Sequence, residues 1–254
     1  MCGISGLANC GDKEALARMT AIQAHRGPDD SGLWEQRFPD GTYFALGSRR
    51  LAILDLSPDG HMPMSNPQRT LWITYNGEIY NFRELRRELQ AKGHTFVSES
   101  DTEVVLRLYE EEGPDCVKRL NGMFAFAIYD LRSGTPSLFV ARDHFGVKPF
   151  YYAHRGERFA FASEIKALLQ VPGIDAVLDP QALHQFLTFL WVPDPQTMFR
   201  GILKLPAGHY GVFREGRLTL TKYWDLTFPS AGADYPRSEG ELAEEIRERF
   251  RRSV

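Results

Sequence analysis

The first six residues, Met1 to Gly6, restrict the fold and chemistry of this chain more than any other stretch. The small side chain at position two permits removal of the initiator methionine, which would leave Cys2 as the N-terminal residue. Its thiol and the new α-amine have ordinary pKa values of about 8.5 and 8. The amine can therefore take the proton of the thiol, which activates a nucleophile within one residue. The alternative is a small buried cysteine that opens a strand.

The composition excludes several classes of protein. The net charge is −3 and charges of both signs are mixed, so no basic stripe indicates a nucleic-acid partner. No apolar run approaches the ~18 residues of a membrane span, and the N-terminus lacks the pattern of a signal peptide. The three cysteines have no close spacing, which favours the reducing cytoplasm. The seven histidines are scattered, so we expect no metal site.

Apolar periodicity and turn residues predict short strands, antiparallel for the most part, and several amphipathic helices. The expected strands are 4–8, 33–38, 43–48, 71–75, 95–97, 123–129, 138–141, 150–153, 158–162, 208–213 and 218–223. The expected helices are 12–24, 82–92, one that starts near 100, 163–169 and 180–189. A charged loop at 25–32 is expected to be held by its own ion pairs, and 56–68 is expected to be a long loop.

Two polar stretches at strand ends are candidates for a binding site. Arg50 precedes a short apolar segment, and an arginine that enters a buried strand usually needs an anion. A bidentate guanidinium is suited to a substrate carboxylate. Asn76-Gly77 is typical of a type I′ hairpin turn, but an exposed amide beside a glycine N–H can also form an oxyanion hole. The local sequence leaves both interpretations open.

A third candidate lies at the start of the second long helix. The polar run Ser100, Asp101 and Thr102 is typical of helix capping. Asp101 could instead hold an ammonium group of a substrate near the helix start. The two roles are compatible, and the local sequence does not separate them.

Seven motifs in this order resemble the glutaminase half of glutamine-hydrolysing asparagine synthetases, which are class II (Ntn-type) glutamine amidotransferases. The resemblance covers residues 2 to 225, and seven motifs in register make it specific. The motifs are Met1-Cys2-Gly3-Ile4, His25-Arg26-Gly27-Pro28-Asp29, Arg50-Leu51-Ala52-Ile53, Tyr75-Asn76-Gly77-Glu78-Ile79-Tyr80-Asn81, Ser100-Asp101-Thr102-Glu103, Asn121-Gly122-Met123-Phe124-Ala125-Phe126, and Arg142-Asp143 with Gly146 and Lys148-Pro149.

The resemblance implies an α+β fold, namely a four-layer αββα Ntn-hydrolase sandwich with two antiparallel sheets. It also implies the hydrolysis of L-glutamine to L-glutamate and ammonia through a thioester on Cys2, with the amine of the same residue as the base. Asn76 and the N–H of Gly77 would hold the oxyanion. The implied glutamine-binding residues are Arg50 for the α-carboxylate, Asp101 for the α-ammonium group, and Leu51, Ile53, Asn76, Gly77 and Glu78 along the pocket.

The resemblance further implies three segments: an amidotransferase domain at 2–225, a linker at 226–237, and at 238–254 the first helix of an ATP-pyrophosphatase synthetase domain. Ser238 and Glu241 form a capping box before that helix. Its nucleotide-binding loop, Ser-Gly-Gly-x-Asp-Ser, does not occur in the sequence. We therefore expect no cofactor for the glutaminase reaction, with ATP and magnesium needed only in the synthetase domain.

The partner expected from the resemblance is that synthetase domain, in the same chain or as a separate subunit. The ammonia acceptor stays open between aspartate and another carboxylate, and so does a homodimer. Two other functions also stay open. One is a non-catalytic module that senses glutamine, and the other is an Ntn hydrolase that acts on different amides.

Overall fold

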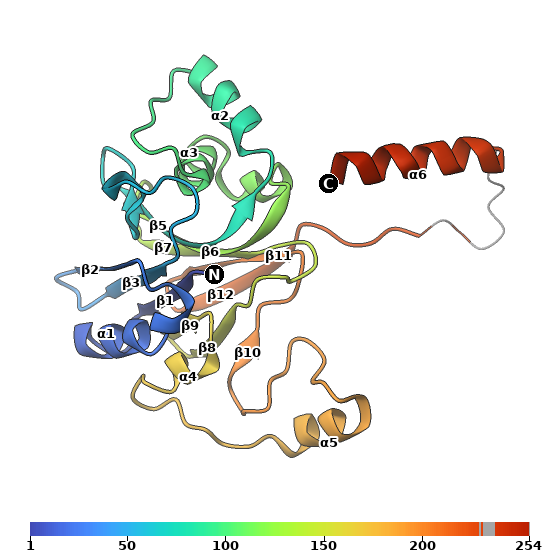
Figure 1. Ribbon diagram of the computed structural model, residues 1–254. Helices are drawn as coiled ribbons and strands as arrows, with labels where there is room; N and C mark the ends of the chain where they lie inside the picture. Colours follow the sequence, from blue (N-terminus) through green and yellow to red (C-terminus); the bar gives the residue numbers. More distant parts are fainter. Residues whose placement is uncertain (229, 231–236, 254) are drawn as a thin grey trace. The chain divides into compact units, whose positions relative to one another are not determined.

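The computed structural model describes residues 1–228, 230 and 237–253, and Figure 1 traces the chain. The chain divides into two compact units, Met1–Trp224 and Asp225–Val254. The predicted linker at 226–237 falls mainly outside the described residues. In the described part, no helix is both long and apolar enough to cross a lipid bilayer.

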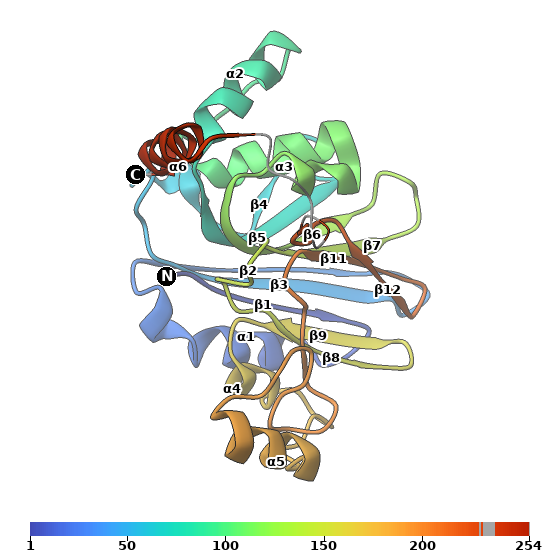
Figure 2. The same cartoon turned by 90° about the vertical axis from the view of Figure 1, so that its right-hand side faces the viewer.

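Two six-stranded antiparallel sheets form the centre of the first unit (Figures 1 and 2). The first sheet has the order β10 (Leu203–Lys204), β8 (Tyr151–Arg155), β9 (Arg158–Ala162), β1 (Gly3–Ala8), β3 (Tyr43–Arg50) and β2 (Asp30–Arg37). The second has the order β12 (Arg217–Lys222), β11 (His209–Arg214), β7 (Ser137–Arg142), β6 (Gly122–Asp130), β5 (Leu71–Ile79) and β4 (Met64–Ser65).

Helices cover the outer face of each sheet and complete four layers. The first sheet is covered by α1 (Lys13–Ala21) and α4 (Ile165–Leu168), and the second by α3 (Asp101–Glu112), against which α2 (Phe82–Ala91) packs (Figure 2). A further helix, α5 (Pro180–Phe189), lies in the connection between α4 and β10. The predicted αββα sandwich is confirmed.

The core between the sheets explains why β1 lacks an alternating pattern. Side chains such as Ile4 and Phe44 of the first sheet pack there with Tyr129 and Val140 of the second. The opposite face of the first sheet packs against α1. Because both faces are covered, all six residues of β1 are buried, and its sequence contains only small or apolar side chains.

Three expectations about local structure were wrong. No strand forms at 95–97, because side chains satisfy this backbone: Arg107 donates to the Thr95 carbonyl, and Glu103 accepts from two successive N–H groups. Strand β2 begins at Asp30, three residues earlier than expected. The expected loop at 56–68 contains a 3-10 turn, Pro58–Gly60, and the short strand β4.

Among its described residues, the second unit contains one helix, α6 (Glu239–Ser253). The predicted capping box is present: the Ser238 N–H donates to Glu241 Oε2 at 2.7 Å, and the Glu241 N–H donates to Ser238 Oγ at 3.4 Å. In the sequence of this segment, apolar residues recur at every fourth position and form a stripe, Leu242, Ile246, Phe250 and Val254; Ile246 and Phe250 are 67% and 70% exposed. The last member of that stripe, Val254, lies outside the described residues.

Candidate active site

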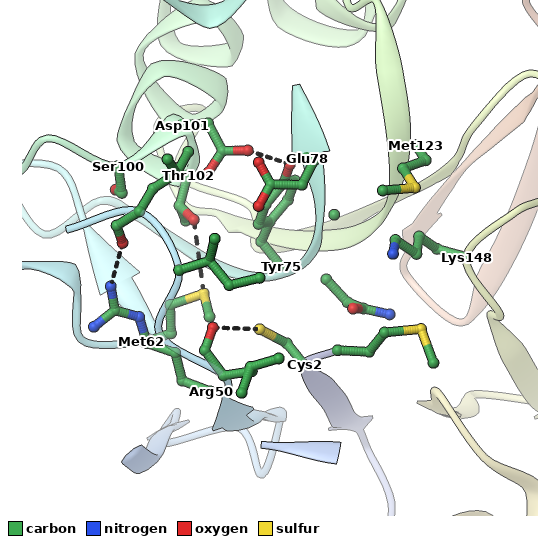
Figure 3. A pocket seen from close by; sticks show the side chains of 16 residues that line it. Cys2, Arg50, Met62, Tyr75, Glu78, Ser100, Asp101, Thr102, Met123 and Lys148 are labelled. Carbon is green, nitrogen blue, oxygen red and sulfur yellow. Dashed lines mark hydrogen bonds between the residues drawn. The ribbon is translucent and has the colours of Figure 1, made fainter. Parts of the chain in front are cut away.

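A cavity of about 320 Å³ opens between the start of β1, the end of β3, the second half of β5 and the start of α3 (Figure 3). Strands β1 and β3 are antiparallel with Gly3 opposite Arg49, so the start of one lies beside the end of the other. Strand β5 supplies the other wall. All eight residues that the sequence singled out line this cavity, namely Cys2, Arg50, Leu51, Ile53, Asn76, Gly77, Glu78 and Asp101.

The thiol of Cys2 is half-buried at the mouth of this cavity. Its Sγ donates to the Leu51 carbonyl at 3.9 Å. Burial raises the pKa of the Cys2 thiol, while this hydrogen bond, the N-terminal ammonium group and Arg50 act in the opposite direction. A thiol in this setting needs a base to become a thiolate. The α-amine that Met1 removal would release is one bond from its Cα.

An ionic cluster fixes the backbone of Cys2. The Arg26 guanidinium donates from Nε to the Cys2 carbonyl at 2.9 Å and from Nη1 to Glu164 at 3.1 Å. The same carboxylate contacts His25 at 2.8 Å and Lys166 at 3.1 Å. An N-terminal residue has covalent support on one side only, so these bonds help to determine its position. The charges of the 25–32 loop thus pair with residues outside the loop, which corrects the expectation: His25 and Arg26 pair with Glu164, and Asp30 contacts His61 at 2.8 Å.

Asn76 and Gly77 lie within β5 and do not form a hairpin turn. Asn76 pairs with Ala125 of β6, and the strand continues past both residues. The Asn76 side chain is 1% exposed, and its Nδ2 has no hydrogen-bond partner among the described residues. A Cβ on Gly77 would lie 2.5 Å from the Met123 carbonyl oxygen, so only glycine fits there. An unpaired buried donor is costly unless a ligand uses it.

The helix cap and the candidate ammonium ligand are different residues. Ser100 is the N-cap of α3, and its Oγ accepts from the Glu103 N–H at 3.3 Å. Asp101 is the first helical residue, and its Oδ2 accepts from the Tyr75 hydroxyl at 2.6 Å and the Ile79 N–H at 3.0 Å. Burial raises the pKa of Asp101, and these two donors oppose the shift.

Arg50 both lines the cavity and holds the loop that follows β3. Its Nη2 donates to the carbonyls of Leu54, at 2.9 Å, and of Asp55, and its Nη1 donates to the Ser57 carbonyl at 3.5 Å. Three of its five N–H groups are used in this way. In the described part of the chain, the Nε–H and one Nη1–H are without a partner and remain for an anion.

Residues 1–224 match a family described as a glutamine amidotransferase domain. The chain belongs to this family. It is 40% identical over 234 residues to asparagine synthetase [glutamine-hydrolyzing] 3 of Bacillus subtilis. The aligned region covers 89% of this chain and 37% of that protein. It is 37% identical over 262 residues to asparagine synthetase [glutamine-hydrolyzing] 1 of the same species, with 100% of this chain and 39% of the relative covered. The chain thus spans little more than a third of the length of these relatives.

The fold has a solved counterpart. Glutamine phosphoribosylpyrophosphate amidotransferase from B. subtilis superposes with a TM-score of 0.64 at 17% identity, over 88% of this chain and 49% of that structure. At this identity the likeness concerns the fold alone. It agrees with the two antiparallel sheets between helices that this domain has.

The amidotransferase pocket also contains residues that the sequence analysis did not assign to it. Lys148 is 7% exposed, and its side chain lines the cavity beside Met123 (Figure 3). Asp143 fixes its loop by accepting from the Lys148 N–H at 3.0 Å and the Val147 N–H at 2.9 Å. The motif that ends in Lys148-Pro149 was the available signal. The other unassigned lining residues are Met1, Leu54, Met62, Tyr75, Ser100, Thr102 and Met123.

Two carboxyl groups give the amidotransferase pocket its electrostatic character. Burial and the nearby Asp101 charge raise the pKa of Glu78, and Lys148 opposes this shift. Like charges that share a buried site favour a cationic ligand between them. In the described residues, no three potential metal-binding side chains are grouped so that they could hold a metal ion. The pocket can therefore bind a zwitterion of modest size beside a thiol.

Proposed function

We propose that this chain hydrolyses L-glutamine to L-glutamate and ammonia, with Cys2 as an N-terminal nucleophile. The observation that carries the proposal is one small pocket that combines a thiol, the unpaired buried amide of Asn76, the guanidinium of Arg50 and the carboxylate of Asp101. A zwitterionic substrate needs a cationic and an anionic partner, and amide hydrolysis needs a nucleophile beside an oxyanion donor.

The proposed reaction starts after Met1 has been removed. The α-amine of Cys2 takes the thiol proton, and Sγ attacks the side-chain amide carbon of glutamine. Asn76 Nδ2 and the Gly77 N–H stabilise the resulting oxyanion. The C–N bond then breaks, the α-ammonium group returns the proton to the leaving nitrogen, and a thioester remains. Water, deprotonated by the same amine, cleaves the thioester and releases glutamate.

Substrate selection follows from the opposite charges of Arg50 and Asp101 in the pocket. Arg50 binds the α-carboxylate through its charge and one uncommitted N–H group, and Asp101 binds the α-ammonium group with Glu78 also in the pocket. Leu51 and Ile53 line the side that faces the methylene groups. A primary amide without a free α-amino acid group would lose both ionic contacts, which favours glutamine over other amides.

The released ammonia would serve a synthetase that uses ATP and magnesium to activate a carboxylate. Two observations support this proposal: the B. subtilis relatives are glutamine-hydrolysing asparagine synthetases by name, and they extend beyond the matched region. Aspartate is the first candidate acceptor. The synthetase domain would follow in the same chain or act as a separate subunit, and we propose the cytoplasm as the location.

The decisive test measures ammonia and glutamate released from glutamine without ATP, magnesium or aspartate. Protein shown by mass spectrometry to begin at Cys2 should release both in equal amounts, and protein that retains Met1 should be inactive. Cys2→Ala should be inactive, whereas Cys10→Ala, which removes a buried thiol outside the pocket, should remain active. Equal activity with Met1 retained would refute the mechanism.

A further inference from the structure

The hydroxyl of Tyr75 is committed to the carboxylate that faces the pocket. Tyr75 lies on β5, is 2% exposed, and donates to Asp101 Oδ2 at 2.6 Å (Figure 3). The Ile79 N–H donates to the same oxygen at 3.0 Å. Neither bond uses Oδ1. Two donors on one oxygen fix the plane of the carboxylate and leave the other oxygen for a ligand.

We propose that Tyr75 is a positioning residue for the α-ammonium site, because its hydroxyl holds Asp101 in the orientation and the ionised form that a free α-amino group requires. This inference rests on the proposed glutamine hydrolysis and adds a determinant of substrate choice. Tyr75 does not need to contact glutamine for this role. It acts through Asp101.

Two carboxyl groups compete for the negative charge at this site, and Tyr75 favours one of them. Burial raises the pKa of both carboxyl groups, and the Asp101 charge raises the pKa of Glu78 further. Only Asp101 receives the phenol, and no hydrogen bond to the Glu78 carboxylate is present among the described residues. The carboxyl group with more donors ionises first, so the phenol directs the charge to Asp101.

The phenol remains a donor throughout the working pH range. Burial, and then the Asp101 charge, raise the pKa of Tyr75 well above its ordinary value. The other charged or titratable groups that face Asp101 are Arg50 at the end of β3, Lys148 on the 142–148 loop and the Cys2 thiol. The cations favour ionised Asp101, and Glu78 and an ionised Cys2 oppose it. Removal of the phenol therefore shifts this balance toward protonated Asp101.

The chain offers a matched control for this pair. The Tyr109 hydroxyl of α3 donates to Asp130 Oδ2 at 3.1 Å, and Tyr109 is 4% exposed. Its ring packs against Phe139, and neither partner lines the cavity around Cys2. Tyr75→Phe and Tyr109→Phe therefore remove the same bond type from buried surroundings, one inside the site and one outside it.

The experiment compares kcat and KM for glutamine in the three proteins with a free Cys2 terminus, from acidic to neutral pH. Tyr75→Phe should raise KM on the order of tenfold or more, since a hydrogen bond to a charged group is lost, with little change in kcat. The acid limb of kcat/KM should move to higher pH, because Asp101 then holds its proton more tightly. Tyr109→Phe should change neither quantity.

A second readout does not depend on how much of each variant is folded. The ratio of kcat/KM for glutamine to that for its analogue without the α-amino group, 4-carbamoylbutanoate, cancels the active fraction. The ratio should fall in Tyr75→Phe and stay at the wild-type value in Tyr109→Phe. An unchanged ratio and an unchanged acid limb would overturn the role of Tyr75. A wild-type chain without glutaminase activity would instead overturn the proposed function itself.

Discussion

The pocket around Cys2 and a larger cavity beside Arg158 differ in whether their polar side chains are buried or exposed. The larger cavity measures about 600 Å³, against 320 Å³ for the pocket, and its lining includes Arg155, Arg158 and Arg200. All three of these side chains belong to exposed residues. The smaller pocket instead contains the buried, unpaired Nδ2 of Asn76 and a buried carboxylate. Volume alone would have selected the wrong cavity.

The two cysteines show the same contrast. Cys10 lines the larger cavity, where its Sγ donates to the Phe159 carbonyl at 3.2 Å. Burial raises the pKa of the Cys10 thiol although Arg158 opposes the shift. Burial also raises the pKa of the Cys2 thiol. Removal of Met1, however, would give Cys2 an α-amine that can act as its base. A thiol becomes a nucleophile when a base takes its proton. Cys10 instead has the nearby Arg158 cation, which cannot accept a proton.

The largest effect is expected from Asn76→Ala. Loss of one oxyanion donor should lower kcat roughly 10²–10³-fold, with a small change in KM, because the donor acts on charge that develops in the transition state. The variant should not be less stable, since it removes a buried donor that has no partner in the described part of the free chain. Steady-state kinetics and thermal unfolding test both statements.

The control for this substitution is Asn66→Ala. Asn66 is equally buried, but its amide donates to Thr70 at 3.0 Å and to Glu110 at 2.8 Å. Its loss should lower the melting temperature and leave kcat of the remaining folded enzyme unchanged. A wild-type kcat for Asn76→Ala would mean that its amide only completes the strand. The buried, unpaired amide of Asn76 would then no longer distinguish the pocket around Cys2 from the larger cavity.

The comparison also shows which features the sequence could reveal. The layered fold and the eight lining residues follow from motifs that are continuous in the sequence. The sequence does not reveal that Asn76 lies within a strand, because Asn-Gly is equally typical of a hairpin turn. The pairing of Asn76 with Ala125 of β6 places it in the strand. Tyr75 was missed for a similar reason. Its partner Asp101 is 26 positions away, and only the packing of α3 on β5 brings them together.

The next largest effect is expected from Asp101→Asn, which should change both the KM for glutamine and the stability of the protein. The amide keeps an acceptor for Tyr75 and Ile79 but cannot pair with an ammonium group, so KM for glutamine should rise by tenfold or more, as an order of magnitude. Burial raises the pKa of Asp101 in the folded chain. The folded state therefore binds its proton more tightly than the unfolded chain, and ionisation lowers stability as pH rises through the raised pKa.

This sign gives a test without substrate. At neutral pH the ligand-free Asp101→Asn variant should melt at a higher temperature than the wild type, and the difference should shrink as pH falls below the ordinary pKa of an aspartate. Melting curves at several pH values supply the measurement. A variant that is less stable than the wild type at neutral pH would show that neighbouring groups already compensate the Asp101 charge in the ligand-free protein.

The smallest effect is expected when the larger cavity loses its charge. Arg155, Arg158 and Arg200 are exposed; Arg158 Nη2 donates to the Pro172 carbonyl at 3.1 Å, and the Arg158 guanidinium also acts on the Cys10 thiol. Simultaneous replacement of all three by alanine should leave kcat and KM within about twofold and change the free energy of unfolding by about 0.5 kcal/mol or less per site. Kinetics and denaturant unfolding of the triple variant would measure this. A large loss of glutaminase activity would show that exposed charge at the larger cavity is coupled to the pocket, and that buried, unpaired groups are not a sufficient guide to the site in this fold.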